Sequence, residues 1–230
     1  MANTTRRSRK ICLRQTKRQT TIPISVGIVS MMKDGSVSQP VRRAFRTALA
    51  NLSTSIGASA NGTLNAPITI YKYNTPDLYN KIKTGQETHW FFTGNLPDFV
   101  TDDGAPIIDK RIYTIKNKMI LFICYSHQLA ALNAGATIYT MQEPIHKNIH
   151  IKQLINDPIF NDLPPSEDFF AYYTQYIRAD EKLAGWKLLA SYEGHVAAMK
   201  YGKNIYSIQV HPERRAETYI VLKNWLAMSS

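Results

Sequence analysis

The sequence predicts an α/β fold: one domain with a central, mostly parallel sheet, flanking helices and an added meander of strands. In the first half, runs rich in Ile, Val and Phe alternate with amphipathic helical patterns, which favours a parallel sheet covered on both faces. In the second half, four strand patterns follow one another with no helix between them. No linker or repeat divides the chain after residue 20. We therefore expect one domain over residues 21–230, preceded by an arm of residues 1–20.

The first half contains the alternating elements. Residues 21–32 are rich in Ile and Val and indicate a buried strand. Residues 38–56 indicate a helix, because Ser38 can cap it and Pro40 suits its first turn. Residues 75–85 indicate a shorter helix that Thr75 would cap. Further strands are expected at residues 66–74, 88–94 and 119–123, with a loop and a short helix over 95–117.

The second half begins with a helix at residues 126–134 and a strand at 136–141. Residues 142–168 contain four prolines and predict an irregular segment. An amphipathic helix is expected to begin near Pro212 and to turn Tyr219, Leu222 and Trp225 inward. The strands between these segments are expected at residues 169–177, 186–192, 196–201 and 204–210.

The charge of the chain is concentrated at its start. The net charge is +11, and residues 1–20 contain seven basic side chains and no acidic one. Such an arm suits nucleic-acid phosphates or an acidic protein surface. No apolar run reaches the roughly 20 residues that span a bilayer, so we expect no membrane contact. The basic residues of the arm are Arg6, Arg7, Arg9, Lys10, Arg14, Lys17 and Arg18.

Cys124 stands between the apolar run at residues 119–123 and the helical pattern that follows it. A strand-to-helix turn would expose its sulfur at the sheet edge, where a helix N-terminus stabilises a thiolate. Ligands bind beyond the carboxyl ends of the strands in open parallel sheets, and Gly94 also falls at such an end. Cys124 is thus a candidate nucleophile, and a buried thiol without a function is the alternative.

A thiolate needs a proton partner, and the segment "IYSIQVHPERR" at residues 205–215 supplies one. His211 follows the last apolar strand, and Glu213 lies two residues further on. Cys124, His211 and Glu213 are therefore the predicted catalytic residues.

These motifs resemble the class I glutamine amidotransferases. The family carries a G-x-C-x-G-H-Q elbow and a late F-H-P-E motif, which read "FICYSHQ" and "VHPE" here. The segments "WFFTGNLPDFVTDDGAPIID" at 90–109, "AGATIY" and "DPIFNDLPPS" at 157–166 are similar to further family segments. The glutaminase half of GMP synthase is the nearest type. The resemblance implies a flavodoxin-like fold.

The resemblance also implies a mechanism. Cys124 would attack the side-chain amide of glutamine, or of another γ-glutamyl compound, to form a thioester. The backbone amides of Gly94, Asn95 and Tyr125 would form the oxyanion hole. Neither a metal nor an organic cofactor is implied, and an ammonia-accepting synthase chain is a possible partner. The implied substrate-binding residues are Gln128, Thr174 and Gln175.

The elbow departs from the family at two positions, because Phe122 and Ser126 replace glycines. Glycine suits such turns because strand and helix approach closely. Phe122 either packs elsewhere or narrows the pocket. If it closes the pocket, the alternative function is a weak or inactive scaffold that binds nucleic acid or a large assembly through its basic arm.

Several other residues have simpler interpretations. His127 is expected to be structural, and His146 and His150 to be solvated rather than metal-binding. Two cysteines, Cys12 and Cys124, indicate a reducing compartment. We expect the cytoplasm or nucleus, or the virion if the divergent elbow reflects a viral origin.

Overall fold

The centre of the fold is an eight-stranded sheet in the order β2-β1-β3-β4-β10-β9-β8-β6. The computed structural model describes residues 24–55, 66–95, 98–165 and 167–230. The basic arm lies outside these residues.

The elements of the first half are β1 (Val26–Ser30), α1 (Gln39–Ser55), β2 (Ile68–Lys72), α2 (Leu78–Thr84), β3 (His89–Phe92), η1 (Lys110–Thr114), β4 (Met119–Ile123) and α3 (Tyr125–Asn133). Those of the second half are β5 (Tyr139–Ile149), β6 (Lys152–Gln153), η2 (Pro158–Phe160), β7 (Phe169–Tyr176), β8 (Trp186–Tyr192), β9 (His195–Tyr201), β10 (Ile205–Ile208), η3 (Pro212–Arg214), η4 (Ala216–Thr218) and α4 (Tyr219–Ala227).

The parallel part of the sheet runs from β2 to β10, with β1, β3 and β4 between them. β9, β8 and β6 extend it with antiparallel pairings. Because β3, β4 and β10 are parallel neighbours, the segments that follow their carboxyl ends meet at one edge of the sheet. The predicted α/β class with a mostly parallel sheet is confirmed.

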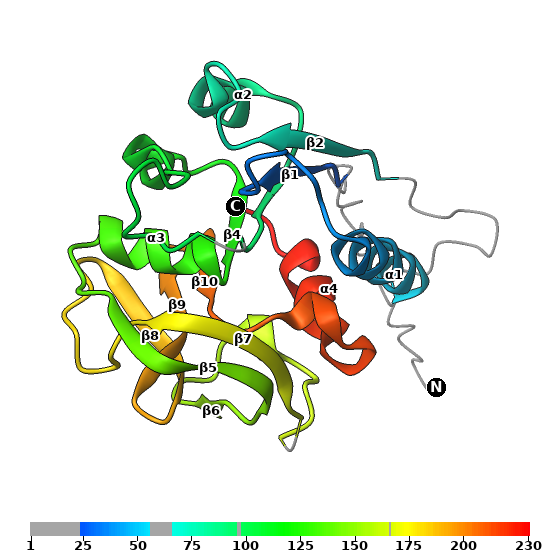
Figure 1. The fold of residues 1–230 in the computed structure, drawn as a ribbon. Coiled ribbons are helices and arrows are strands. Elements are labelled where there is room, and N and C mark those ends of the chain that lie inside the picture. The colour runs from blue at the N-terminus through cyan, green and yellow to red at the C-terminus, as the bar shows by residue number, and fades with distance from the viewer. Residues whose placement is uncertain (1–23, 56–65, 96–97, 166) are drawn as a thin grey trace, which may run out of the picture.

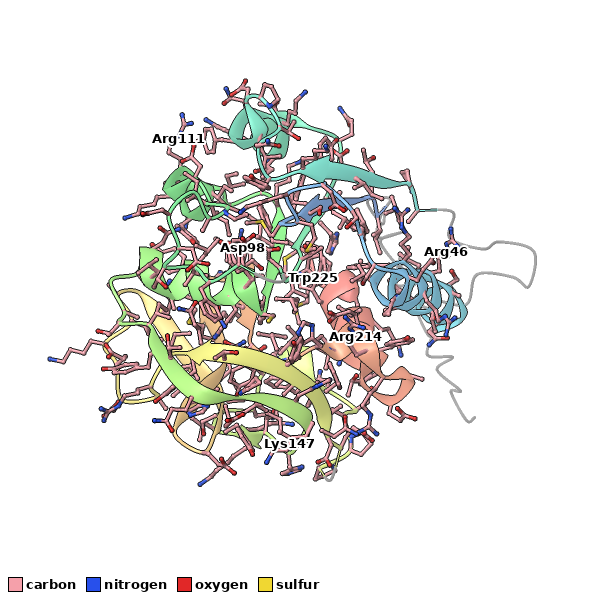
Figure 2. All side chains as sticks on the ribbon, viewed as in Figure 1. Arg46, Asp98, Arg111, Lys147, Arg214 and Trp225 are labelled. Carbon is pink, nitrogen blue, oxygen red and sulfur yellow. The ribbon has the colours of Figure 1, made fainter. Side chains whose placement is uncertain are left out.

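Helices cover both faces of the sheet (Figure 1). On one face, α1 and α4 pack against alternate residues of the strands, and the Phe45 and Trp225 rings meet at 6.3 Å. Figure 2 shows Trp225 pointing from α4 into the interior. On the other face, α2, η1 and α3 bury a second cluster that includes Trp90, Phe122 and Leu129. Burial on both faces explains why β1, β3 and β4 consist almost wholly of apolar residues.

The prediction of an irregular segment over residues 142–168 is wrong in part. β5 continues through it to Ile149 and pairs antiparallel with β7 in a separate two-stranded sheet (Figure 1). The pairing register shifts between Thr140 and Ile145, and exposed Pro144 lies in that interval. Proline is compatible with a strand at such an irregular, solvent-facing position because no ladder donor is needed there.

Two helix ends also differ from the prediction. Thr75 does not cap α2, because its hydroxyl accepts a hydrogen bond from Lys72 N at 3.1 Å. The residue at the cap position is Asp77, whose backbone is left-handed with φ 55°. The last helix does not begin at Pro212, since η3 and η4 come first and extended Arg215 separates them. α4 begins only at Tyr219.

Candidate active site

Cys124 occupies a sharp turn between β4 and α3. Its backbone has φ 53° and ψ −108°, a conformation that L-residues rarely adopt. Such strain costs on the order of 1–3 kcal/mol and is found mainly where a function requires it. Cys124 N donates to Ile208 O at 2.9 Å, which fixes the turn to β10. The turn therefore has the geometry of a nucleophile elbow.

Ser126 stabilises this elbow. Its hydroxyl accepts a hydrogen bond from Ile123 N at 2.7 Å and donates to Phe92 O at 2.9 Å. The side chain thus joins the first turn of α3 to the ends of β3 and β4. The hydroxyl of Ser126 therefore adds hydrogen bonds to the turn that a glycine at this position could not make.

Phe122 points away from the nucleophile. It belongs to the cluster beneath α3 and η1, where its ring lies 4.8 Å from that of Phe92 and 6.0 Å from that of Tyr113. It is fully buried there and does not line the pocket that contains Cys124. The sequence allows Phe122 either to pack elsewhere or to narrow the pocket. In the structure it packs into the core.

His211 and Glu213 form a buried pair beyond the end of β10. His211 Nδ1 lies 2.7 Å from Glu213 Oε1. His211 N donates to Phe170 O at 2.9 Å, which ties the histidine to β7. Burial alone would lower the pKa of His211, but the negative charges of Glu213 and Cys124 outweigh it and raise the pKa to about 10. The imidazole is thus held protonated near neutral pH.

Gly94 lies directly beside both reactive side chains. A Cβ placed on Gly94 would lie 3.3 Å from Cys124 Cβ, 3.8 Å from Cys124 Sγ and 3.4 Å from His211 Cε1. The loop after β3 can therefore approach the nucleophile closely only with glycine at this position. The structure brings together Gly94, Cys124, His211 and Glu213 from separate parts of the chain.

A cavity of about 270 Å³ opens beside Cys124. Its walls come from the loop after β3, the start of α3 and the middle of β7. Most of the predicted oxyanion and substrate residues line it. The lining residues are Asn95, Asp98, Phe99, Cys124, Tyr125, Gln128, Tyr172, Tyr173, Thr174 and Gln175.

Backbone donors are available at this cavity. As the first residue of α3, Tyr125 has an amide without an intrahelical acceptor. Within the described ranges, the amides of Gly94 and Asn95 donate no hydrogen bond to another residue. The Tyr125 hydroxyl donates to Pro106 O at 2.9 Å, which holds the following loop against α3.

Three glutamine residues are connected by hydrogen bonds near the nucleophile. Gln128 Nε2 donates to Gln175 O at 2.6 Å and to Gln209 Oε1 at 3.2 Å. Gln209 Nε2 in turn lies 3.8 Å from Cys124 Sγ. Gln175 Oε1 accepts from Val100 N at 2.9 Å, so its side chain positions the loop after β3.

Sequence reasoning assigned no role to Gln209 or Asp98. Gln209 could have been noticed as an uncharged polar residue within the buried apolar run "IYSIQV". Asp98 gave no such signal, because only the folded loop brings it to the cavity. Cys124 Sγ also lies 3.6 Å from Tyr172 O, a contact with the backbone that side-chain patterns in the sequence do not indicate.

His127, His146 and His150 do not line the cavity beside Cys124. His127 is fully buried, its Nδ1 lies 2.8 Å from Ser207 Oγ, and burial lowers its pKa to about 3. His146 is exposed on β5 and stacks near Tyr172, while His150 Nδ1 lies 3.4 Å from Asp168. In the described part of the chain, no three potential ligands gather as a metal site requires.

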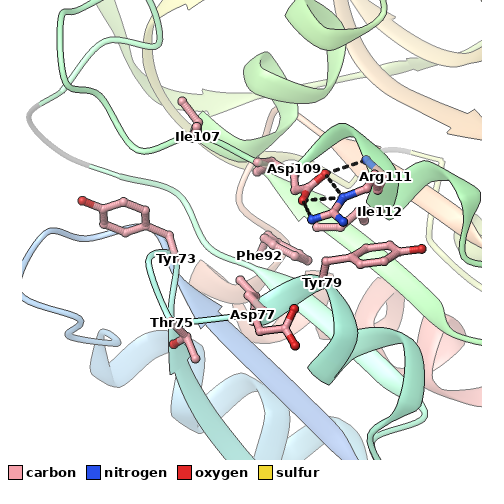
Figure 3. A pocket seen from close by; sticks show the side chains of 11 residues that line it. Tyr73, Thr75, Asp77, Tyr79, Phe92, Ile107, Asp109, Arg111 and Ile112 are labelled. Atoms are coloured by element: carbon pink, nitrogen blue, oxygen red, sulfur yellow. Dashed lines mark hydrogen bonds and ion pairs between the residues drawn. The ribbon is translucent and has the colours of Figure 1, made fainter.

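A second cavity, of about 330 Å³, opens between α2 and the segment that leads into η1 (Figure 3). Its lining includes Phe92, Tyr73 and strongly exposed Ile107, and the Asp109–Arg111 ion pair lies at its edge. It contains neither cysteine nor histidine. The cavity beside Cys124 is the candidate active site because it contains the strained cysteine next to His211. None of the described helices is long and apolar enough to cross a bilayer.

Comparison with known proteins identifies the family. The family model described as glutamine amidotransferase class-I matches residues 55–226, and the chain belongs to this family. The chain is 35% identical over 147 residues to a glutamine-hydrolysing GMP synthase of Caldicellulosiruptor saccharolyticus, covering 63% of this chain and 27% of that protein. It is 36% identical over 118 residues to the corresponding enzyme of Pyrobaculum aerophilum, covering 51% and 22%. The resemblance stated from the motifs is confirmed.

Solved structures show the same fold. A candidate GMP synthase component from Thermoplasma acidophilum superimposes with a TM-score of 0.62 at 17% identity, over 88% of this chain and 92% of that one. A glutamine amidotransferase from Thermotoga maritima gives 0.54 at 13% identity, over 88% and 80%. The chain matches only about a quarter of the length of the curated relatives. It corresponds to the glutamine amidotransferase domain of such proteins.

Proposed function

We propose that the chain hydrolyses the side-chain amide of glutamine through a covalent thioester on Cys124. The observation that carries this proposal is the strained Cys124 turn, which adjoins both a buried His211–Glu213 pair and a cavity of about 270 Å³. Family membership supports the same chemistry, because relatives carry the name of glutamine-hydrolysing enzymes.

The first half of the reaction releases ammonia. The Cys124 thiolate attacks the amide carbon, and the carbonyl oxygen takes up negative charge in the tetrahedral intermediate. The backbone amides of Gly94, Asn95 and Tyr125 stabilise this charge. The His211 imidazolium donates its proton to the leaving nitrogen, so the C–N bond breaks and ammonia departs. The products of this step are the thioester and neutral His211.

The second half regenerates the enzyme. Neutral His211 accepts a proton from water, whose oxygen attacks the thioester carbon. The C–S bond breaks, glutamate leaves, and the thiolate–imidazolium pair is restored. Glu213 orients the imidazole through Nδ1 and stabilises its charge at both stages.

We further propose that the ammonia passes to a synthase domain or chain. The relatives are named GMP synthases, and the matched region is about a quarter of their length. The acceptor chemistry of a GMP synthase would then lie outside the matched region. Glutamine or another γ-glutamyl compound is the substrate, and the synthase is the partner.

Ammonia release from glutamine by the purified chain, followed through reductive amination of 2-oxoglutarate, tests the proposal. We expect turnover in the wild type, loss of at least about 10³-fold in Cys124→Ala, and unchanged turnover in Cys12→Ala. Adding a GMP synthase synthetase domain tests whether a partner raises the rate. Equal ammonia release by wild type and Cys124→Ala would refute the proposed nucleophile.

A further inference from the structure

Charged side chains are unevenly distributed in the lining of the cavity beside Cys124. Among its lining residues, only Asp98 carries a formal charge apart from the nucleophile itself. The facing wall on β7 presents the neutral side chains of Tyr173, Thr174 and Gln175. A carboxylate at one place in an otherwise neutral cavity favours a ligand with a cationic group at a matching position.

Asp98 is fixed in place and retains capacity to bind. Its Oδ1 lies 2.9 Å from Lys33 Nζ, and its Oδ2 accepts from Asn95 Nδ2 at 2.9 Å. Both contacts lower the pKa of the carboxyl, so it is ionised at neutral pH. A carboxylate has about four lone-pair sites, and these two contacts use only two of them. Further hydrogen bonds from a ligand can therefore be accepted.

The backbone that follows Asp98 is held by two hydrogen bonds. Phe99 N donates to Asp102 Oδ2 at 2.8 Å, and Val100 N donates to Gln175 Oε1 at 2.9 Å. Figure 2 shows Asp98 beside α3, within the outline of the molecule. Its side chain is only 14% exposed, whereas that of Lys33 is 58% exposed. The carboxylate thus lies on the cavity side of the ion pair and the ammonium on the solvent side.

We propose that Asp98 binds the α-ammonium group of the substrate amino acid while the γ-amide reaches Cys124. This inference rests on the proposed glutamine hydrolysis and names the part of the site that selects an α-amino acid over other amides. Glutamine carries an ammonium and a carboxylate at the end remote from its amide. Asp98 offers the charge complementary to the ammonium, and it is the carboxylate that lines the cavity.

The test compares two substrates that differ by one group. L-Glutamine and glutaric acid monoamide have the same amide and carboxylate, but the second lacks the α-ammonium. For Asp98→Asn we expect KM for glutamine to rise about 10-fold or more, with kcat changed less than about 2-fold. The kcat/KM for glutaric acid monoamide should stay within about 2-fold. Asp103→Asn, which makes the same charge change at an exposed position of the same loop, is the control.

Several results would overturn the inference. Equal losses on both substrates would mean that Asp98 only positions Asn95 and the loop, and an unchanged KM for glutamine would mean that it has no role. If the wild type releases no ammonia, the proposed hydrolysis fails, and calorimetry on Cys124→Ala then decides about Asp98. Binding of glutamine at least about 10-fold tighter than glutaric acid monoamide, lost on adding Asp98→Asn, would uphold it. Equal binding or none would refute it.

Discussion

Acid should destabilise this fold through two buried histidines. His127 and His89 are almost fully buried, and in each the Nε2 atom has no hydrogen-bond partner among the described residues. Burial lowers the pKa from 6.5 to about 3 for His127 and to about 4 for His89. Below pH 6.5 the unfolded chain therefore binds protons that the folded chain does not.

The magnitude follows from the size of this window. Each pH unit between the unfolded and folded pKa values costs about 1.4 kcal/mol per histidine. Lowering the pH from 6.5 to 5 should thus remove about 2 kcal/mol for each, or about 4 kcal/mol together. His211 acts in the opposite sense, because its raised pKa gives stability that is present below pH 6.5 and lost as the pH rises toward about 10.

Urea unfolding between pH 7.5 and 4.5, followed by tryptophan fluorescence, measures this effect. The difference in unfolding free energy between the wild type and His127→Gln should change by about 1.4 kcal/mol per pH unit below pH 6.5. His146→Gln, the same substitution at an exposed position, is the control. A flat curve for His127→Gln would refute the reasoning.

Further predictions concern the elbow, the loop after β3 and the arm. Ser126→Ala should lower the unfolding free energy by about 1–3 kcal/mol in urea, and unchanged stability would show its hydrogen bonds to be unimportant. Phe122→Ala should cost about 3–5 kcal/mol without raising turnover, whereas a more active enzyme would mean that the ring obstructs the site. Gly94→Ala should reduce kcat/KM about 10-fold or more with little change in thermal midpoint, because its Cβ would press on Cys124; wild-type kinetics would contradict this. Deleting residues 1–20 should leave glutamine turnover within about 2-fold and abolish any salt-sensitive nucleic-acid binding, and binding that survives the deletion would place that surface elsewhere.

The parallel half of the fold could be predicted closely from sequence. The bounds of β4 agree with the expected strand at 119–123, because residues buried on both faces form a continuous apolar run that breaks at Cys124. The helix expected at 126–134 begins and ends one residue earlier in the structure, at Tyr125 and Asn133. Here local propensity, burial and function all favour the same boundaries.

The continuation of β5 beyond residue 141 is the main element that the sequence does not predict. β5 is exposed along most of its length and contains Pro144, so neither alternation nor propensity distinguishes it from a loop. Its partner β7 lies some twenty residues away in sequence, and only the pairing with β7 makes it a strand. β7 itself agrees with the strand expected at 169–177, and it supplies the wall of the cavity that contains Thr174 and Gln175.

The site itself was predicted in part. Two short motifs predict Cys124, His211 and Glu213 as catalytic residues, and their roles stay predictions. In the structure Cys124 and His211 lie beside Gly94, and Glu213 pairs with His211. The position of Asp98 at the cavity could not be predicted, because it depends on contacts between segments that are distant in the sequence, such as the ion pair with Lys33.

Covalent labelling of the nucleophile tests the central claim most directly. A diazo-ketone analogue of glutamine should add one equivalent to the protein, with peptide mass spectrometry locating it on Cys124, and excess glutamine should slow the reaction. Cys124→Ala should remain unlabelled while Cys12→Ala labels normally. A label on Cys12, or none on folded protein, would contradict the assignment of Cys124 as a nucleophile that attacks glutamine.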